Sequence, residues 1–317
     1  MTLLTGIASL MHLMVDGLCI CCLYLLPIFG GQDIVGVFLT YNVLAFVSQP
    51  LSGWCVDRVR RRHRVLLLAV VLLAMAVVTA MLATRSDAYG LIVLTAVLLG
   101  LGNSLFHVWG GKQTVVTSGN DLRALGVFVS TGALGLSVGA VWCSWQLAFA
   151  MLSGIGLLTA AYLVIDGTMY VESSVEVASE ERYQSQFTTA AVCIALIVLM
   201  AVVMFRSYVG QEFSSAIPKS ETIILVIGCV SMLGKMAGGW LAKGLGIVTS
   251  MTGVLLVVLV AMLMRDTGTL MLLIGLFAMN CTMPVTLWLA NSVLRGREGL
   301  AFGLLAAALI PGWLMAI

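Results

Sequence analysis

Two ionisable side chains stand one helical turn apart in the first long apolar run of the chain. His12 and Asp16 share one face of a helix because residues i and i+4 lie on the same side. Ionisable residues are costly at membrane depth, so they are candidates for function. Because histidine exchanges protons near neutral pH, the pair is predicted to bind and release protons. A buried pair that only hydrogen-bonds neighbouring helices is the structural alternative.

The fourth apolar run carries a second polar group, Asn103-Ser104-Leu105-Phe106-His107-Val108-Trp109-Gly110-Gly111-Lys112. Asn103 and His107 share a helix face, and Lys112 lies about a turn further along. We expect His107 to take part in proton coupling. Asn103 and Lys112 are expected to face a substrate cavity.

The second half of the chain offers further cavity candidates. Arg206 could attract an anion or reach the membrane interface, and Lys235 could serve as an anion site or pair with a linker residue. Asn280 and Trp288 could supply polar and aromatic contacts from a helix that Pro284 is expected to bend. No phosphate loop, metal cluster or nucleophile–base group appears in the sequence. We therefore expect no enzyme activity, no metal and no cofactor beyond a proton gradient.

Composition indicates which elements must hold these residues. The 317 residues are 61% hydrophobic and 9% charged, with a mean hydropathy of +1.11. A soluble domain carries roughly 25% charge, so the chain is predicted to be an all-α polytopic membrane protein. The net charge of +2 gives no reason to expect nucleic acid binding. The predicted spans cover about 3–29, 34–55, 65–84, 89–112, 122–143, 146–166, 188–208, 221–242, 245–264, 268–292 and 298–316.

The basic residues predict the orientation of these eleven spans. Short loops rich in arginine and lysine stay in the cytoplasm. With a cytoplasmic N-terminus, the inside loops hold Arg58, Arg60, Arg61, Arg62, Arg64, Arg123, Arg182, Lys243, Arg295 and Arg297. The outside loops hold Arg85, Lys219 and Arg265. We therefore expect a multi-pass protein of a bacterial-style inner membrane.

The stretch between the second and third spans carries a motif. It combines a small residue, an acid and paired arginines at one helix end: Gly53, Asp57, Arg58, Arg61 and Arg62. This spacing resembles the loop-2/3 signature of the major facilitator superfamily, with Arg60 where that signature usually has a second glycine. The resemblance implies a conformational latch at the cytoplasmic side. A plain anchor loop is the alternative.

Further motifs are similar to the fosmidomycin-resistance-type subgroup of that superfamily. They are His12 with Asp16, Gln49-Pro50, Ser104-Leu105-Phe106-His107, Arg206-Ser207-Tyr208-Val209-Gly210, Thr282-Met283-Pro284-Val285-Thr286 and Arg297-Glu298-Gly299. Two positions depart from that pattern, because Val108 and Trp109 stand where the subgroup has proline and glutamate. The lost carboxylate is expected to remove a possible proton site and to change the cavity lining. The fifth span has Gly132, Gly135 and Gly139, spaced for close packing.

The chain also contains an internal repeat. Gln49-x-x-x-Gly53-Trp54-x-x-Asp57 matches Lys235-x-x-x-Gly239-Trp240-x-x-Lys243, and Gly126-Val127-Phe128 resembles Gly299-Leu300-Ala301-Phe302. Parallel repeats are typical of major facilitator proteins. We expect an N-terminal bundle over 1–167, a cytoplasmic linker over 168–187 and a C-terminal bundle over 188–317. A complete second repeat would have a twelfth span, which is expected where the sequence ends.

The resemblance implies a monomeric secondary transporter that works by alternating access between two bundles. We expect proton-coupled efflux of a small molecule, anionic or drug-like. Two alternatives stay open: a proton-coupled uptake symporter for a small organic solute, and a membrane scaffold or partner subunit that transports nothing.

Overall fold

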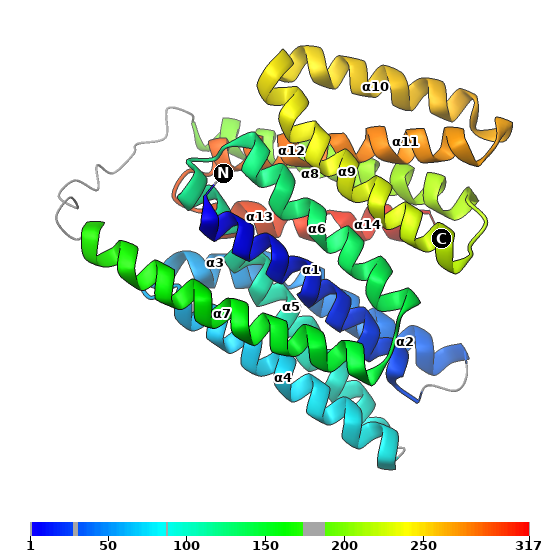
Figure 1. Ribbon diagram of the computed structural model, residues 1–317. Helices are drawn as coiled ribbons and strands as arrows, with labels where there is room; N and C mark the ends of the chain where they lie inside the picture. Colours follow the sequence, from blue (N-terminus) through cyan, green and yellow to red (C-terminus); the bar gives the residue numbers. More distant parts are fainter. Residues whose placement is uncertain (1, 28–30, 87, 174–187, 317) are drawn as a thin grey trace.

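A computed structural model describes residues 2–27, 31–86, 88–173 and 188–316, which form helices and no strand (Figure 1). The helices of the first half are α1 (Leu3–Leu25), α2 (Gly31–Asn42), α3 (Gln49–Arg58), α4 (His63–Ser86), α5 (Tyr89–Ser118), α6 (Leu122–Val141) and α7 (Trp145–Ser173). Those of the second half are α8 (Thr189–Ala216), α9 (Glu221–Leu245), α10 (Ile247–Leu263), α11 (Thr269–Cys281), α12 (Met283–Val293), α13 (Glu298–Ala307) and α14 (Leu309–Leu314).

The predicted spans appear in the predicted order. Within the described residues, nine helical segments are long and apolar enough to cross a membrane, and two shorter apolar ones cover Ile247–Leu263 and Glu298–Leu314. The first span is shorter than predicted, since α1 ends at Leu25 rather than near residue 29. Leu26 has extended backbone angles, because a residue before proline is disfavoured in the helical conformation.

Three of these spans are interrupted within their length. A π-helical turn (η1, Val43–Val47) separates α2 from α3, α11 gives way to α12 at Thr282, and α13 to α14 at Ala308. Pro284, where a bend is expected, stands in the first turn of α12, directly after the interruption at Thr282. Breaks of this kind are tolerated where protein or a cavity surrounds the helix.

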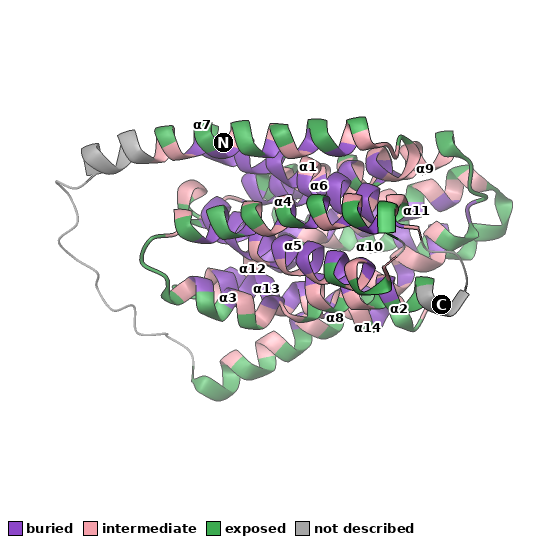
Figure 2. Cartoon of the chain, turned by 90° about the horizontal axis from the view of Figure 1, so that it is seen from below, coloured by how far each residue is buried: buried purple, intermediate pink, exposed green. Residues whose placement is uncertain are grey.

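Buried residues (purple) concentrate on α1, α5 and α6, whereas exposed residues (green) line the outer faces of α7 and α8 (Figure 2). One large apolar cluster comes mainly from α1 to α7, and a smaller one comes from α8 to α11. The large cluster also includes residues of the second half, among them Leu199, Ala290 and Phe302. Most of the predicted linker lies outside the described residues, which leave out 174–187.

Close helix crossings join the two halves and follow the internal repeat. The carbonyl of Gln49 lies against Gly303, and the carbonyl of Lys235 lies 2.9 Å from the position of a Cβ on Gly126. Because Gln49 and Lys235 hold the same place in the repeat, Gly126 corresponds to Gly303. The sequence match of Gly126 with Gly299 is therefore wrong by one helical turn.

Candidate functional site

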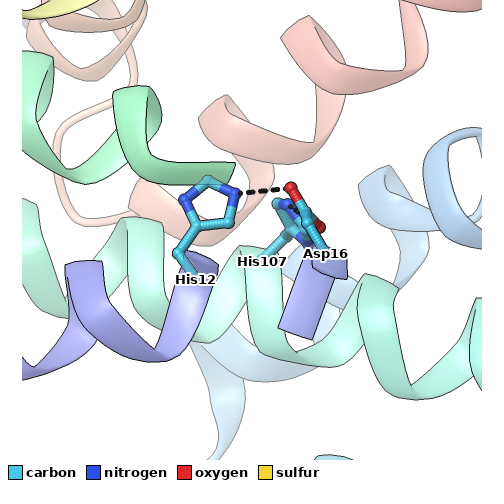
Figure 3. Close-up of side chains that lie close together, drawn as sticks. All are labelled: His12, Asp16 and His107. Carbon is cyan, nitrogen blue, oxygen red and sulfur yellow. Dashed lines mark ion pairs between the residues drawn. The ribbon is translucent and has the colours of Figure 1, made fainter. Parts of the chain in front are cut away.

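A buried group of three ionisable side chains lies where α1 meets α5 and α6 (Figure 3). His12 Nε2 is 3.2 Å from Asp16 Oδ2, and His107 Nε2 is 3.4 Å from Asp16 Oδ1. Asn103 Nδ2 donates to Asp16 Oδ1 over 3.0 Å. The two imidazole rings meet edge to face with centroids 4.5 Å apart. We call His12, Asp16 and His107 the charged triad.

Backbone carbonyls orient both imidazoles of the charged triad. His12 Nδ1 lies 2.7 Å from the carbonyl oxygen of Phe128, and His107 Nδ1 lies 2.9 Å from that of Asn103. A carbonyl can only accept, so each Nδ1 must carry a hydrogen. Each Nε2 then faces a carboxylate oxygen, and that contact is attractive only when Nε2 is also protonated. The triad can therefore hold up to two additional protons beside Asp16.

A glycine on α6 makes room for the triad. A Cβ at Gly132 would overlap Asp16 Oδ2 and would lie 2.5 Å from His12 Nε2. The next glycines along this face, Gly135 and Gly139, lie against the carbonyls of Leu13 and Gly17 on α1. The close packing predicted for the three glycines is confirmed, because without side chains α6 approaches the polar face of α1.

The charged triad lines a cavity of about 410 Å³ between the two halves of the chain. Arg206 of α8 and Lys235 of α9 line the same cavity, as does Asn280 of α11. Much of the remaining lining is apolar and comes from both halves: Phe46, Leu136, Ile227, Met283, Phe302 and Leu305. The residues predicted from opposite ends of the sequence therefore meet around one space.

Arg206 and Lys235 meet no acidic partner within the described chain. Arg206 is 8% exposed, and its Nη1 atom has no hydrogen-bond partner. Neither cation belongs to any ion pair found among the described side chains. An unpaired buried cation is unfavourable. The cavity therefore suits a ligand that brings negative charge.

Three predicted cavity residues lie elsewhere. Lys112 forms a buried ion pair with Asp57 at 2.8 Å, because its long side chain reaches α3 instead of the cavity. Trp288 does not line the cavity; it packs against apolar clusters, and its carbonyl accepts from Asn120 at 3.3 Å. Asn103 also stays outside the lining and orients Asp16.

The predicted latch residues lie at the far end of α3. The Asp57 carboxylate accepts from the backbone N–H groups of Gly299 and Leu300, at 2.9 and 2.8 Å. Gly53 lies against the Gly299 carbonyl. A carboxylate is favourable at a helix N-terminus, so Asp57 joins α3 to the start of α13.

The arginines of the motif make weaker contacts. The Arg58 guanidinium lies 3.5 Å from the centre of the Trp54 ring. Arg61 is exposed, whereas Arg62 is half-buried and close enough for its charge to act on Tyr162. The joint between α3 and α13 is therefore made by Gly53, Asp57 and Lys112 rather than by these arginines.

Sequence reasoning missed two residues that make contacts between the two halves of the chain. Phe302 lines the cavity and lies against Gly111, with its ring 6.5 Å from that of His107. Asp121 precedes α6 and lies 3.7 Å from Lys243 at the end of α9. Lys243 corresponds to Asp57 in the repeat, which is the signal that could have revealed this contact.

The two departures from the subgroup pattern lie outside the cavity lining. Trp109 is 1% exposed, and its ring packs edge to face on Tyr162 of α7 at 4.9 Å. Val108 is buried as well. The expectation that these positions change the cavity lining is therefore wrong, because neither residue lies on the wall of the cavity.

The charged triad also has the compactness of a cation site. One nitrogen or oxygen atom from each of its members lies within 4.8 Å of the others. The sequence predicts no metal cluster, because histidines separated by about a hundred residues form no spacing motif. Measurements of proton binding at the triad therefore need a chelator in the buffer.

Comparison with known proteins identifies the fold. The crystal structure of FucP, a Major Facilitator Superfamily transporter in the outward conformation, matches with a TM-score of 0.65 and 11% identity, covering 98% of this chain and 90% of that chain. A bacterial homologue of the iron transporter ferroportin, in an outward-facing state, matches at 0.63 and 14%, covering 99% and 91%. The human organic anion transporter MFSD10 (TETRAN) matches at 0.69 and 15%, covering 98% and 92%.

These identities establish a shared fold and nothing finer. A search of curated proteins finds no significant match. The family model of the Major Facilitator Superfamily matches residues 6–316, nearly the whole chain. Members of this family and the similar structures named above are transporters, not enzymes. The chain is therefore a multi-pass membrane protein that belongs to the Major Facilitator Superfamily.

Proposed function

We propose that the protein is a secondary active transporter that moves a small organic anion through its central cavity, coupled to protons. The single observation that carries this proposal is the joint lining of one cavity by the charged triad and by Arg206 and Lys235. The triad supplies proton sites, and the two cations supply an anion site. The apolar lining favours an anion with an apolar body.

Alternating access accounts for the rest of the geometry. Asp57 joins the bundles at one end, and the similar FucP and ferroportin-homologue structures are described as outward-facing. From this we infer a conformation closed on the cytoplasmic side of an inner membrane. The distribution of arginine and lysine among the loops favours a cytoplasmic N-terminus. A latch needs to differ by only a few kcal/mol between states to shift their populations.

Two coupling modes are compatible with this proposal. The motifs shared with the fosmidomycin-resistance-type subgroup favour efflux in exchange for protons. Cotransport of the anion with protons in the same direction is the second mode. The two modes differ in how the charges of the cavity couple the binding of the anion to the binding of protons. The printed name of MFSD10, an organic anion transporter, supports the anionic substrate class.

Flux into proteoliposomes tests the proposal. Radiolabelled benzenesulfonate suits the cavity because it is permanently anionic, carries an apolar ring and does not cross membranes as a neutral acid. We expect a pH gradient to drive its flux through the wild-type protein, in buffer containing EDTA. The variant Asp16→Asn should fold but lose the effect of the gradient, because the triad then lacks its carboxylate.

Asp266→Asn is the matched control, since that carboxylate is 96% exposed and lies far along the chain from the triad. It should keep wild-type flux. Gradient-driven flux that persists in Asp16→Asn would refute the proton role of the triad. A complete absence of flux in the wild-type protein would support the scaffold alternative.

A further inference from the structure

The charges of the cavity are divided between the two halves of the chain. Five of the described lining residues are ionisable: His12, Asp16 and His107 on one side, and Arg206 and Lys235 on the other. With both histidines neutral, one negative charge faces two positive ones. The cavity therefore carries a net positive charge before any ligand enters.

The two sides interact electrostatically. The positive charge of Lys235 opposes a positive charge on His107. Arg206 likewise opposes the positive charge of Lys235, whereas Asp16 favours it. Protonation of the triad would therefore add positive charge to a cavity that already carries an excess. An anion held between Arg206 and Lys235 would offset their positive charge, so that protons would bind the triad more favourably.

Among the residues that the structure describes, the remaining neighbours of the triad bring no further charge. Asn103 of α5 and the Phe128 carbonyl of α6 are neutral, and so is Phe302 of α13. The Cys19 thiol accepts a hydrogen bond from Asn103, and Tyr41 of α2 lies beyond it. A thiol and a phenol stay neutral near pH 7. The net charge around the cavity therefore depends on Arg206, Lys235 and the triad.

Binding free energies are reciprocal, so an anion that favours protonation must itself bind more tightly when the triad is protonated. Exchange requires the opposite relation, in which each ligand expels the other. Cooperative binding loads both ligands onto the same conformation, and both then cross together when the cavity changes its access.

We propose that the anion and protons bind this cavity cooperatively and cross the membrane in the same direction. The protein is then an anion–proton cotransporter. This inference rests on the proposed function and names its coupling mode. It favours the uptake alternative over efflux by exchange.

Affinity as a function of pH is the first test. Benzenesulfonate does not titrate, so any pH dependence belongs to the protein. We expect its affinity for the purified protein, in EDTA, to rise on the order of tenfold between pH 8 and pH 6. Lys235→Gln and Arg206→Lys should weaken binding at every pH, and His107→Gln should flatten the pH dependence. Lys219→Gln removes a cation from the loop between α8 and α9 and should bind like the wild type.

The direction of proton movement is the second test. Proteoliposomes containing the pH dye pyranine receive an inward gradient of benzenesulfonate. We expect the lumen to acidify, with no such signal from Lys235→Gln. An alkaline lumen, or affinity that is constant or falls as pH is lowered, would overturn cotransport while leaving anion transport standing. Benzenesulfonate flux without any proton movement would instead contradict the proposed proton coupling itself.

Discussion

The Asp57 carboxylate and the backbone N–H of Gly299 form a 2.9 Å hydrogen bond across the boundary between the two halves of the chain. The same carboxylate holds Lys112, so one side chain joins α3, α5 and α13. Gly299 and Leu300 stand in the first turn of α13, and Phe302 of the same helix lines the cavity. This short path connects the latch with the lining of the cavity.

Removing the Asp57 carboxylate should affect transport rate more than anion affinity. Asp57 does not line the cavity, so Asp57→Ala leaves the binding groups in place and weakens the joint to α13. Initial rates and equilibrium binding of benzenesulfonate measure the two effects. Unchanged turnover with lost binding would contradict the latch assignment.

The thermal stability of Asp57→Ala tests the ion pair between Asp57 and Lys112. Asp57→Ala leaves Lys112 buried without a partner, which should cost about 3–5 kcal/mol. Asp57→Ala combined with Lys112→Met should recover part of that loss, because the unpaired charge is gone. Thermal unfolding in detergent compares them, and strictly additive effects would show that the pair is not coupled.

Gly132→Ala should disturb the charged triad without removing any of its members. A methyl group there would occupy the space of Asp16 Oδ2 and His12 Nε2, so α1 and α6 must separate or the pair must break. Overpacking of this kind typically costs about 1–3 kcal/mol. We expect gradient-driven flux to fall strongly. Gly156→Ala on α7, where a Cβ meets nothing within 4 Å, should retain wild-type flux.

Much of this architecture could be predicted from the sequence because lipid imposes strict rules on it. Apolar length revealed the spans, and the i, i+4 spacing revealed the pairing of His12 with Asp16. Periodicity gives the face of a helix but not the neighbour it meets. Lys112 was therefore expected in the cavity, although its partner Asp57 lies on α3.

Contacts between distant residues could not be predicted in the same way. Asp57 and Gly299 lie 242 residues apart, and their meeting depends on how the two bundles pack. His107 joins the triad through a crossing of α1 and α5 that no spacing motif records. Burial of Trp109 against Tyr162 likewise depends on the placement of α7.

The contact between Asp121 and Lys243 should not contribute to pH dependence near neutrality. A hydrogen bond from the Arg123 side chain is the main cause that lowers the Asp121 pKa to about 2. A lowered pKa in the folded state stabilises the fold above the ordinary carboxyl pKa, and that contribution is lost as pH falls toward 2. Asp121→Asn should therefore leave the pH profile of flux unchanged between pH 5.5 and 8, whereas His107→Gln should alter it.

The cap role of Asp121 allows a separate check. Its carboxylate accepts from the backbone N–H of Arg123 at 2.8 Å. Asparagine caps helices about as well as aspartate, whereas alanine does not, so Asp121→Ala should cost about 1 kcal/mol more than Asp121→Asn. A change in the flux profile of Asp121→Asn near pH 7 would show that this contact takes part in coupling.

Phe302→Ala should let protons leak past the cavity. The Phe302 ring lines the cavity, with the Phe128 ring 6.1 Å away and Gly111 packed against it. Removing it leaves a void beside His107, which water can enter from the cavity. Stability should fall by up to about 3–5 kcal/mol, the range for buried phenylalanine. Without benzenesulfonate, pyranine in proteoliposomes should report faster proton entry for Phe302→Ala than for the control Phe205→Ala, because Phe205 is 56% exposed. If proton entry is no faster in Phe302→Ala than in the control, groups other than Phe302 close the cavity to protons.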